Sequence, residues 1–533
     1  MSGSSSGSQS GAIDAHAATV QTGYDFEGPA IELGALVVDG AARADVQVRI
    51  PLAMVNRHGL VAGATGTGKT KTLQLMAEQL CSVGVPVLAA DIKGDLSGLA
   101  MAGEPNDKVS ARATEVGQEW AGVACPVELL ALGGEGTGLP LRATMTSFGP
   151  TLLAKVLDLN EVQESSLGLV FHFADKAGLA MLDLKDLRAV IQFLTGDEGA
   201  QSLKDLGGLS RATAGVILRE LIAFEDQGAD RFFGEPEFQT SDLLRVLPDG
   251  RGVVSLLELP RLQDRPQLFS TFLMWLLADL FEELPEVGDV DKPKLVFFFD
   301  EAHLLFDDAS KEFLHAVAQT VRLIRSKGVG VFFVTQTPSD VPAEVLAQLG
   351  NRVQHALRAF TPADARALKA TASTFPNSAY DLEEVLTQLG IGEAVVTVLS
   401  DRGAPTPVAW TRLRAPQSRM APADESVLAQ VVAASPLRER YVEEVDRESA
   451  YERLAARVQQ SPAPEGPAGG SRTSDEPRTT HEPRAPRTPR PSKPERSTAK
   501  QMLESSAFKQ LARSAAAVVG REIARSIFGT RRR

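Results

Sequence analysis

The sequence predicts an α/β fold with a mainly parallel sheet. Short apolar runs alternate with stretches of helical periodicity, which is the pattern of strands joined by crossover helices. Three of these runs end in polar residues, at Asp91, Asp300 and Gln336, and a fourth leads into a glycine-rich loop. Because the carboxyl ends of parallel strands lie along one edge of a sheet, we expect these residues to lie close together at a ligand site.

The glycine-rich loop matches the phosphate-binding pattern G-x-x-x-x-G-K-[ST] at every fixed position. An apolar run at residues 59–62 precedes it, and residues 71–80 place apolar side chains on one helical face. A glycine-rich turn that matched by chance would lack this strand-and-helix context. Backbone N–H groups of such a loop, and of the helix that follows, bind phosphate oxygens. The predicted nucleotide-binding residues are Gly63, Ala64, Thr65, Gly66, Thr67, Gly68, Lys69 and Thr70, with Lys69 on the terminal phosphates and Thr70 on Mg²⁺.

A second motif follows the apolar run at residues 295–299, which ends in Asp300 and Glu301. This is the Walker B pattern of nucleotide-hydrolysing proteins. Asp300 is placed to bind Mg²⁺, directly or through water. Glu301, one residue further on, is placed to polarise the water that attacks the γ-phosphate. The nearby His303 is more typical of a structural or coupling residue than of a base.

A third apolar run, residues 330–335, ends before Gln336. A polar residue at this strand end faces the γ-phosphate if the strand lies between those that carry the first two motifs. Gln336 is therefore predicted to sense the nucleotide or to position water. The alternative is that Gln336 only caps the end of the strand.

Arginines near the end of a predicted helix at residues 311–325 have two interpretations. Basic residues at a helix C-terminus are expected because they complement the helix dipole. Alternatively, Arg322 or Arg325 is an arginine finger that contacts the γ-phosphate in a neighbouring subunit. Arg352 and Arg358, in a predicted strand further along the chain, are rival candidates.

Composition divides the chain into parts. Residues 1–22 are rich in Ser and Gly and are predicted to be disordered. Residues 23–440 are predicted to form one nucleotide-binding domain, in which residues from about 100 to 250 form an α-helical insertion. Residues 455–499 are rich in Pro and Arg and are predicted to be a disordered linker, whereas residues 500–529 regain the pattern of an amphipathic helix.

Charge, cysteine content and hydropathy restrict the class of protein. The formal net charge of −13 argues against a surface that binds nucleic acid everywhere, although a local basic channel remains compatible with it. The two cysteines cannot build a disulfide framework. The N-terminus has no signal pattern, and the most apolar helical stretch, residues 268–281, is too short for an integral membrane segment. We therefore expect a cytoplasmic protein.

Taken together, the motifs GATGTGKT, FFFDEAH, the R-x-x-R-x-K-G-V-G-V-F-F-V-T-Q-T-P run, GNRV and IGEA resemble those of the HerA/FtsK superfamily of DNA-pumping P-loop ATPases. The sequence is most similar to the bacterial HerA-like (YjgR-type) proteins. The resemblance covers roughly residues 25–440, and it is most specific around the two Walker motifs.

The resemblance implies a RecA-like P-loop NTPase core, ATP and Mg²⁺ as cofactors, and a homohexameric ring with ATP at each subunit interface. It also implies a helicase or translocase that works on double-stranded DNA. The residues implied by the resemblance are Lys69 and Thr70 for Walker A, Asp300 and Glu301 for Walker B, Gln336 as sensor, and Arg322 or Arg325 as finger. Two alternatives stay open, namely an ATPase that remodels protein and an assembly scaffold switched by nucleotide without motor activity.

Overall fold

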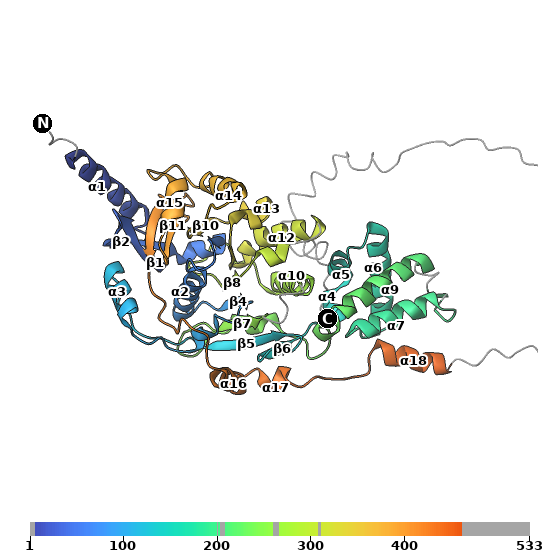
Figure 1. The fold of residues 1–533 in the computed structure, drawn as a ribbon. Helices are drawn as coiled ribbons and strands as arrows, with labels where there is room; N and C mark the ends of the chain where they lie inside the picture. Colours follow the sequence, from blue (N-terminus) through green and yellow to red (C-terminus); the bar gives the residue numbers. More distant parts are fainter. Residues whose placement is uncertain (1–5, 200, 203–207, 260–265, 307–310, 461–533) are drawn as a thin grey trace, which may run out of the picture.

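The computed structural model describes residues 6–199, 201–202, 208–259, 266–306 and 311–460. One large sheet organises these residues (Figure 1). Its strands are β1 (Ala30–Val38), β2 (Ala41–Pro51), β3 (Gly59–Ala62), β4 (Val87–Asp91), β5 (Val127–Leu132), β6 (Leu139–Leu141), β7 (Val254–Glu258), β8 (Leu295–Phe299), β9 (Val329–Thr335), β10 (Asn351–Gln354), β11 (Glu393–Thr397) and β12 (Ala409–Leu413).

The strand order is β2-β1-β12-β11-β10-β3-β9-β8-β4-β7-β5-β6. All neighbours from β10 to β6 are parallel, whereas β11, β12, β1 and β2 form an antiparallel extension at one side. The prediction of a mainly parallel α/β sheet is therefore confirmed. The sequence did not predict β12. The strand predicted at the position of β10 ran to residue 358, four residues beyond the observed end at Gln354.

Helices flank the sheet on both faces. They are α1 (Ser6–Gly23), α2 (Lys69–Ser82), α3 (Asp107–Val116), α4 (Met145–Phe148), α5 (Pro150–Val156), α6 (Glu161–Lys176), α7 (Leu184–Thr195), α9 (Arg211–Asp226), α10 (Pro266–Glu283), α11 (His303–Phe306), α12 (Lys311–Ile324), α13 (Ala343–Leu346), α14 (Pro362–Ala372), α15 (Leu382–Gln388), α16 (Glu425–Ala434), α17 (Arg438–Tyr441) and α18 (Ala450–Gln460).

Alternation along the central strands divides the core into two layers. On β8, Phe297 and Phe299 join the cluster that contains α10 and α12, whereas Phe298 joins the cluster that contains α2. Successive strand residues point to opposite faces, so a continuous apolar run supplies both layers. This double burial fixes the central strands, and it therefore fixes the edge where their carboxyl ends meet.

The helical insertion is smaller than the sequence predicted. Within residues 100–250, β5 and β6 extend the main sheet, and the helical block runs from α4 to α9. In Figure 1 this block lies at one end of the sheet, and α5 packs against α10 and α12. The prediction was wrong at its lower bound because short apolar runs such as 127–132 do not distinguish a buried strand from a helix.

The prediction of a disordered N-terminus over residues 1–22 is wrong for the part that the structure describes. Helix α1 begins at Ser6 and packs against β1 and β2. Its residues Ala17 and Val20 are buried, as is Tyr24 just beyond its end. A spacing of three and four residues puts these side chains on one face, and contact with the strand pair outweighs the weak helical propensity of the segment.

The predicted linker at residues 455–499 is also wrong at its start, because α18 continues to Gln460. This helix packs against α7, and its start is anchored by Asp186, which accepts hydrogen bonds from Ser449 Oγ (2.5 Å) and from the backbone N–H of Tyr451 (2.9 Å). The rest of the predicted linker and the predicted helix at residues 500–529 lie outside the described residues.

Candidate nucleotide site

The phosphate loop lies at the carboxyl end of β3, between β9 and β10. Gly63 and Gly68 have φ angles of +155° and +115°, which an L side chain rarely adopts. A Cβ atom on Gly63 would lie 2.4 Å from the Cβ of His355, so the loop also needs glycine there for space. The Gly63 N–H donates to Thr335 O (3.2 Å) and the Ala64 N–H to Ala356 O (2.8 Å). These bonds fasten the base of the loop. The N–H groups that a phosphate would contact are those later in the loop and at the start of α2.

Lys69 is the first residue of α2 and is buried, with 7% of its surface exposed. Its Nζ donates to two carbonyls of its own loop, Gly63 O at 2.6 Å and Ala64 O at 3.3 Å. Burial lowers the pKa of Lys69, and the negative charge of Glu301 opposes that shift. The ammonium is therefore held at the centre of the loop, where it can bind an anion.

Asp300 and Glu301 follow β8 directly, as predicted. The backbone N–H of Glu301 donates to Oδ1 of Asp300 at 2.9 Å, and Glu301 has a left-handed φ of +48°. Residues in this conformation are uncommon outside glycine and gather at functional sites. Among the described residues, the buried Oδ2 of Asp300 and Oε2 of Glu301 accept no hydrogen bond, although His303 Nδ1 lies 3.4 Å from Glu301 Oε2. Burial and the neighbouring charge of Glu301 raise the pKa of Asp300 to about 6, so the pair favours a cation.

The turn after β4 contributes a residue that sequence analysis did not assign. Lys93 forms an ion pair with Oε1 of Glu301. The turn is shaped by Asp91, whose carboxylate accepts from the N–H groups of Gly94 (2.7 Å) and Leu96 (3.0 Å). Burial, with the charge of Asp95, raises the pKa of Asp91 to about 7. A polar turn at this strand end was visible in the sequence, but its partner, far along the chain, was not.

Gln336 lies at the carboxyl end of β9, beside the phosphate loop, and its side chain is exposed. A different residue caps this strand end. Asp340 accepts hydrogen bonds from Thr335 Oγ1 (2.6 Å) and from the Thr337 N–H (2.8 Å). The strand-end role that was the alternative for Gln336 thus belongs to Asp340, while its role as a sensor remains a prediction.

The candidate arginines lie at two different edges of the sheet. Arg322 and Arg325 precede β9, so they lie at its amino end, about 20 Å along the strand from the phosphate loop of the same chain. A contact with phosphate would have to be made in another subunit. Arg358 follows β10, which runs parallel to β3, and therefore lies at the same edge as the phosphate loop. Arg352 is partly buried, and burial lowers its pKa.

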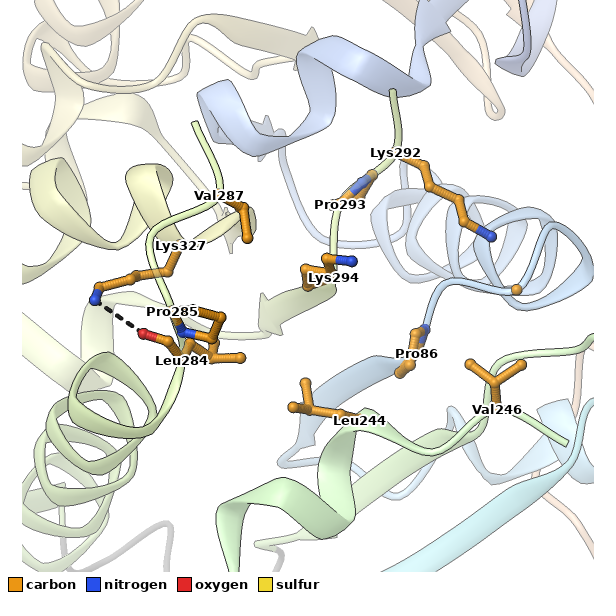
Figure 2. Close-up of a pocket in the computed structure, with 11 residues that line it drawn as sticks. Pro86, Leu244, Val246, Leu284, Pro285, Val287, Lys292, Pro293, Lys294 and Lys327 are labelled. Carbon is orange, nitrogen blue, oxygen red and sulfur yellow. Dashed lines mark hydrogen bonds between the residues drawn. The ribbon is translucent and has the colours of Figure 1, made fainter. Parts of the chain in front are cut away.

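A separate cavity lies at the amino edge of the sheet (Figure 2). It has a volume of about 360 Å³, and its lining includes Pro86, just before β4, and Lys294, just before β8. Figure 2 also shows Lys327, whose Nζ donates to Leu284 O at 2.9 Å. Since the phosphate loop and the Walker B residues follow the carboxyl ends of the strands, this cavity does not belong to the nucleotide site.

A magnesium ion fits the donor set at the carboxyl edge. Asp300 offers a buried carboxylate oxygen without a protein donor, and the Thr70 hydroxyl lies in the first turn of α2. No cluster of three or more His, Cys, Asp or Glu side chains suited to a metal occurs in the described ranges. Proteins usually hold Mg²⁺ through one or two side chains together with nucleotide phosphates, and Asp300 and Thr70 would be those side chains here.

Fold and site together define a P-loop NTPase. Over residues 37–533 the sequence matches the family described as Helicase HerA-like C-terminal. The chain belongs to this family and is a P-loop ATPase of the HerA-like class. The resemblance that its motifs suggested is confirmed.

The chain is similar to two archaeal proteins named DNA double-strand break repair helicase HerA. It is 23% identical to that of Sulfurisphaera tokodaii over 382 residues, which is 68% of each protein. It is 20% identical to that of Saccharolobus solfataricus over 359 residues, which is 66% of this chain and 64% of the relative. The matched segment thus spans about two thirds of these relatives.

Solved structures with a related shape include the bacterial conjugative coupling protein TrwB lacking its first 70 residues, with a TM-score of 0.49, 16% identity, and coverage of 76% of this chain and 95% of that chain. VirB4 of Thermoanaerobacter pseudethanolicus has a TM-score of 0.45 and 14% identity, with 73% and 97% covered. Within the described part of the chain, no helix combines the length and apolarity needed to cross a membrane.

Proposed function

We propose that this protein is an ATP-driven motor, a helicase or translocase that acts on double-stranded DNA as a homohexameric ring. The observation that supports hydrolysis most directly is that Lys69 lies at the same edge of the sheet as Asp300 and Glu301, although more than two hundred residues separate Lys69 from this pair in sequence. Membership of the HerA-like family and the names of the HerA relatives support DNA as the substrate.

In the proposed reaction, ATP binds with its phosphates in the loop of residues 63–70. Lys69 exchanges its carbonyl partners for oxygens of the terminal phosphates, and the N–H groups at the start of α2 bind the adjacent oxygens. Asp300 and Thr70 hold Mg²⁺, which supplies positive charge to the phosphate oxygens.

Glu301 orients the attacking water, whose O–H donates a hydrogen bond to the Glu301 carboxylate. Its backbone has a left-handed φ, and its carboxylate forms the ion pair with Lys93. Gln336 completes this edge as the sensor. Arg322 or Arg325, which lie at the opposite edge, act on the site of a neighbouring subunit, and this requires at least two adjacent subunits, as in the proposed ring.

The test is ATP hydrolysis by the full chain with Mg²⁺, measured with and without blunt duplex DNA at low and high salt. The expected result is hydrolysis that DNA stimulates several-fold at low salt and less at high salt, because contacts with phosphates release counterions. Hydrolysis that duplex DNA leaves unchanged at low salt would contradict the DNA motor and leave the protein-remodelling ATPase. Nucleotide binding without hydrolysis, equal in wild type and Glu301→Gln, would instead favour the scaffold.

A further inference from the structure

We propose that Lys93 is a second phosphate-binding lysine of this site and that its contact with the γ-phosphate releases Glu301. The lysine shares its charge between the Glu301 carboxylate and the γ-phosphate of a bound triphosphate. When it turns to the phosphate, Glu301 is released to orient water. This inference rests on the proposed ATPase function and adds a residue that distinguishes ATP from ADP.

The position of Lys93 is fixed by its backbone. Asp91 is the last residue of β4, and its carboxylate accepts hydrogen bonds from the N–H groups of Gly94 and Leu96. These bonds hold the backbone on both sides of Lys93. The Asp91 carboxylate is buried, whereas 45% of the Lys93 side chain is exposed. A long side chain on a rigid turn can exchange partners without moving the strand.

Lys93 forms its ion pair with a buried carboxylate, that of Glu301. Only 8% of the Glu301 side chain is exposed, so the ion pair lies partly out of solvent, where charges attract each other more strongly than at the surface. Burial lowers the pKa of Lys93, but the hydrogen bond and charge of Glu301 outweigh it, so the pKa lies above its usual value. A carboxylate engaged by an ammonium is a weaker acceptor for water. The pair therefore holds Glu301 in a less reactive arrangement.

Lys69 lies close enough to this ion pair to interact with both of its charges. Lys93 and Glu301 both act on the pKa of Lys69, in opposite directions, so the two ammonium groups and the carboxylate lie within electrostatic reach of one another. A γ-phosphate bound by Lys69 carries more negative charge than a single carboxylate and competes with Glu301 for Lys93. The terminal phosphate of ADP, one position further back, does not compete in this way.

The experiment measures affinity without turnover. Binding of a fluorescent non-hydrolysable ATP analogue and of fluorescent ADP is titrated on the full chain, with Mg²⁺ and with EDTA. Lys93→Ala is expected to weaken binding of the analogue by about tenfold, the size of one charge-assisted hydrogen bond, and to leave ADP within about twofold. Lys93→Arg keeps the charge and should restore most of the preference for the analogue.

A matched control is Lys185→Ala on α7. Its side chain is also 45% exposed and also forms ion pairs, with Asp183 and Glu452, in the helical block away from the phosphate loop. This variant should bind both nucleotides as the wild type does. A general effect of removing a paired lysine would appear here too.

Glu301→Gln supplies an independent readout. Removing the charge that holds Lys93 should strengthen binding of the analogue several-fold, and Lys93→Ala in the Glu301→Gln background should abolish the gain. The proposal is overturned if Lys93→Ala weakens analogue and ADP equally, or if it lowers turnover while the ratio of the two affinities stays at the wild-type value. A wild-type chain that binds neither nucleotide would instead contradict the proposed function itself.

Discussion

Lys69 is buried at the start of α2, where its ammonium donates to two carbonyls of its own loop. We expect Lys69→Ala to weaken ATP binding at least tenfold, because the terminal phosphates lose a charged partner in a partly desolvated site. Fluorescent ATP titration measures this loss, and thermal unfolding shows whether the variant is folded. Lys292→Ala is the control, since Lys292 Nζ also donates to a backbone carbonyl, Val83 O at 3.0 Å, but lies at the opposite edge. Equal affinity in wild type and Lys69→Ala would contradict the assignment of the loop.

Glu78 gives the stability of the fold a defined dependence on pH. It lies on α2 and accepts hydrogen bonds from the N–H groups of Gln417 (2.8 Å) and Ser418 (3.0 Å), which hold the segment after β12 along the helix. Burial raises its pKa from the usual 4.5 to about 7. Below pH 4.5 the carboxyl is protonated in both folded and unfolded chains. The contribution of Glu78 to the free energy of unfolding therefore falls as pH rises from about 4.5 to 7, and it stays low above pH 7.

We expect Glu78→Gln to remove this dependence. Relative to the wild type, the variant should gain stability between pH 5 and pH 8, by on the order of 3 kcal/mol at most. Urea unfolding at the two pH values measures the difference, and a variant whose relative stability is the same at both would show that Glu78 is ionised in the folded protein near its ordinary pKa. The same residue links α2, and with it the phosphate loop, to the segment beyond β12.

Among the elements, α1 is the one for which composition predicted disorder and the structure shows a packed helix. A disordered segment would tolerate any substitution, whereas Val20 is fully buried against the strand pair of β1 and β2. We expect Val20→Ala to cost about 1–3 kcal/mol of folding free energy, through lost contacts and the cavity left behind. Thr19→Ala, at an exposed neighbouring position, should change stability little. Identical unfolding midpoints for the two variants would contradict the packing of α1 and favour a disordered N-terminal segment.

The carboxyl ends of β3, β4, β8 and β9 show why elements, rather than single residues, build the site. Each strand is short, and each is followed by a segment that carries at least one functional group. Asp91 and Asp340 have no assigned chemistry, yet they shape the turns after β4 and β9 through hydrogen bonds to backbone and hydroxyl groups. The positions of Lys93 and Gln336 therefore depend on carboxylates that sequence motifs do not mark.

For the whole molecule, the placement of the arginines predicts catalysis shared between subunits. Lys69→Ala chains and Arg322→Ala/Arg325→Ala chains should each be inactive alone. When they are mixed in equal amounts, an interface regains a complete site wherever an intact phosphate loop meets an intact arginine, which is roughly a quarter of interfaces in a closed ring assembled at random.

The measurement is ATPase activity of the mixture, with size-exclusion chromatography to verify that the two variants co-assemble. Recovery of activity is the expected result. Mixed oligomers without activity would show that these arginines act within their own chain or not at all. Full activity of the double arginine variant would show that neither is the finger and would leave Arg358 as the candidate. Wild type mixed with Lys69→Ala controls for dilution of active chains.

The sequence alone determined the parts that depend on local pattern. Contiguous apolar runs predicted the central strands, and the loop at residues 63–70 carried its own strand-and-helix context, because glycine positions, the lysine and the dipole of the next helix act within a few residues of each other. Asp300 and Glu301 were visible for the same reason. The family resemblance then supplied the expected use of these groups.

The tertiary structure decided what depends on contacts between distant residues. It paired Lys93 with Glu301, 208 residues apart in sequence, and placed Arg322 and Arg325 at the edge away from their own phosphate loop. It also turned residues 6–23 into a helix and residues 127–132 into a strand. Each outcome depends on burial against a partner elsewhere in the chain, and that free energy does not appear in local composition or periodicity.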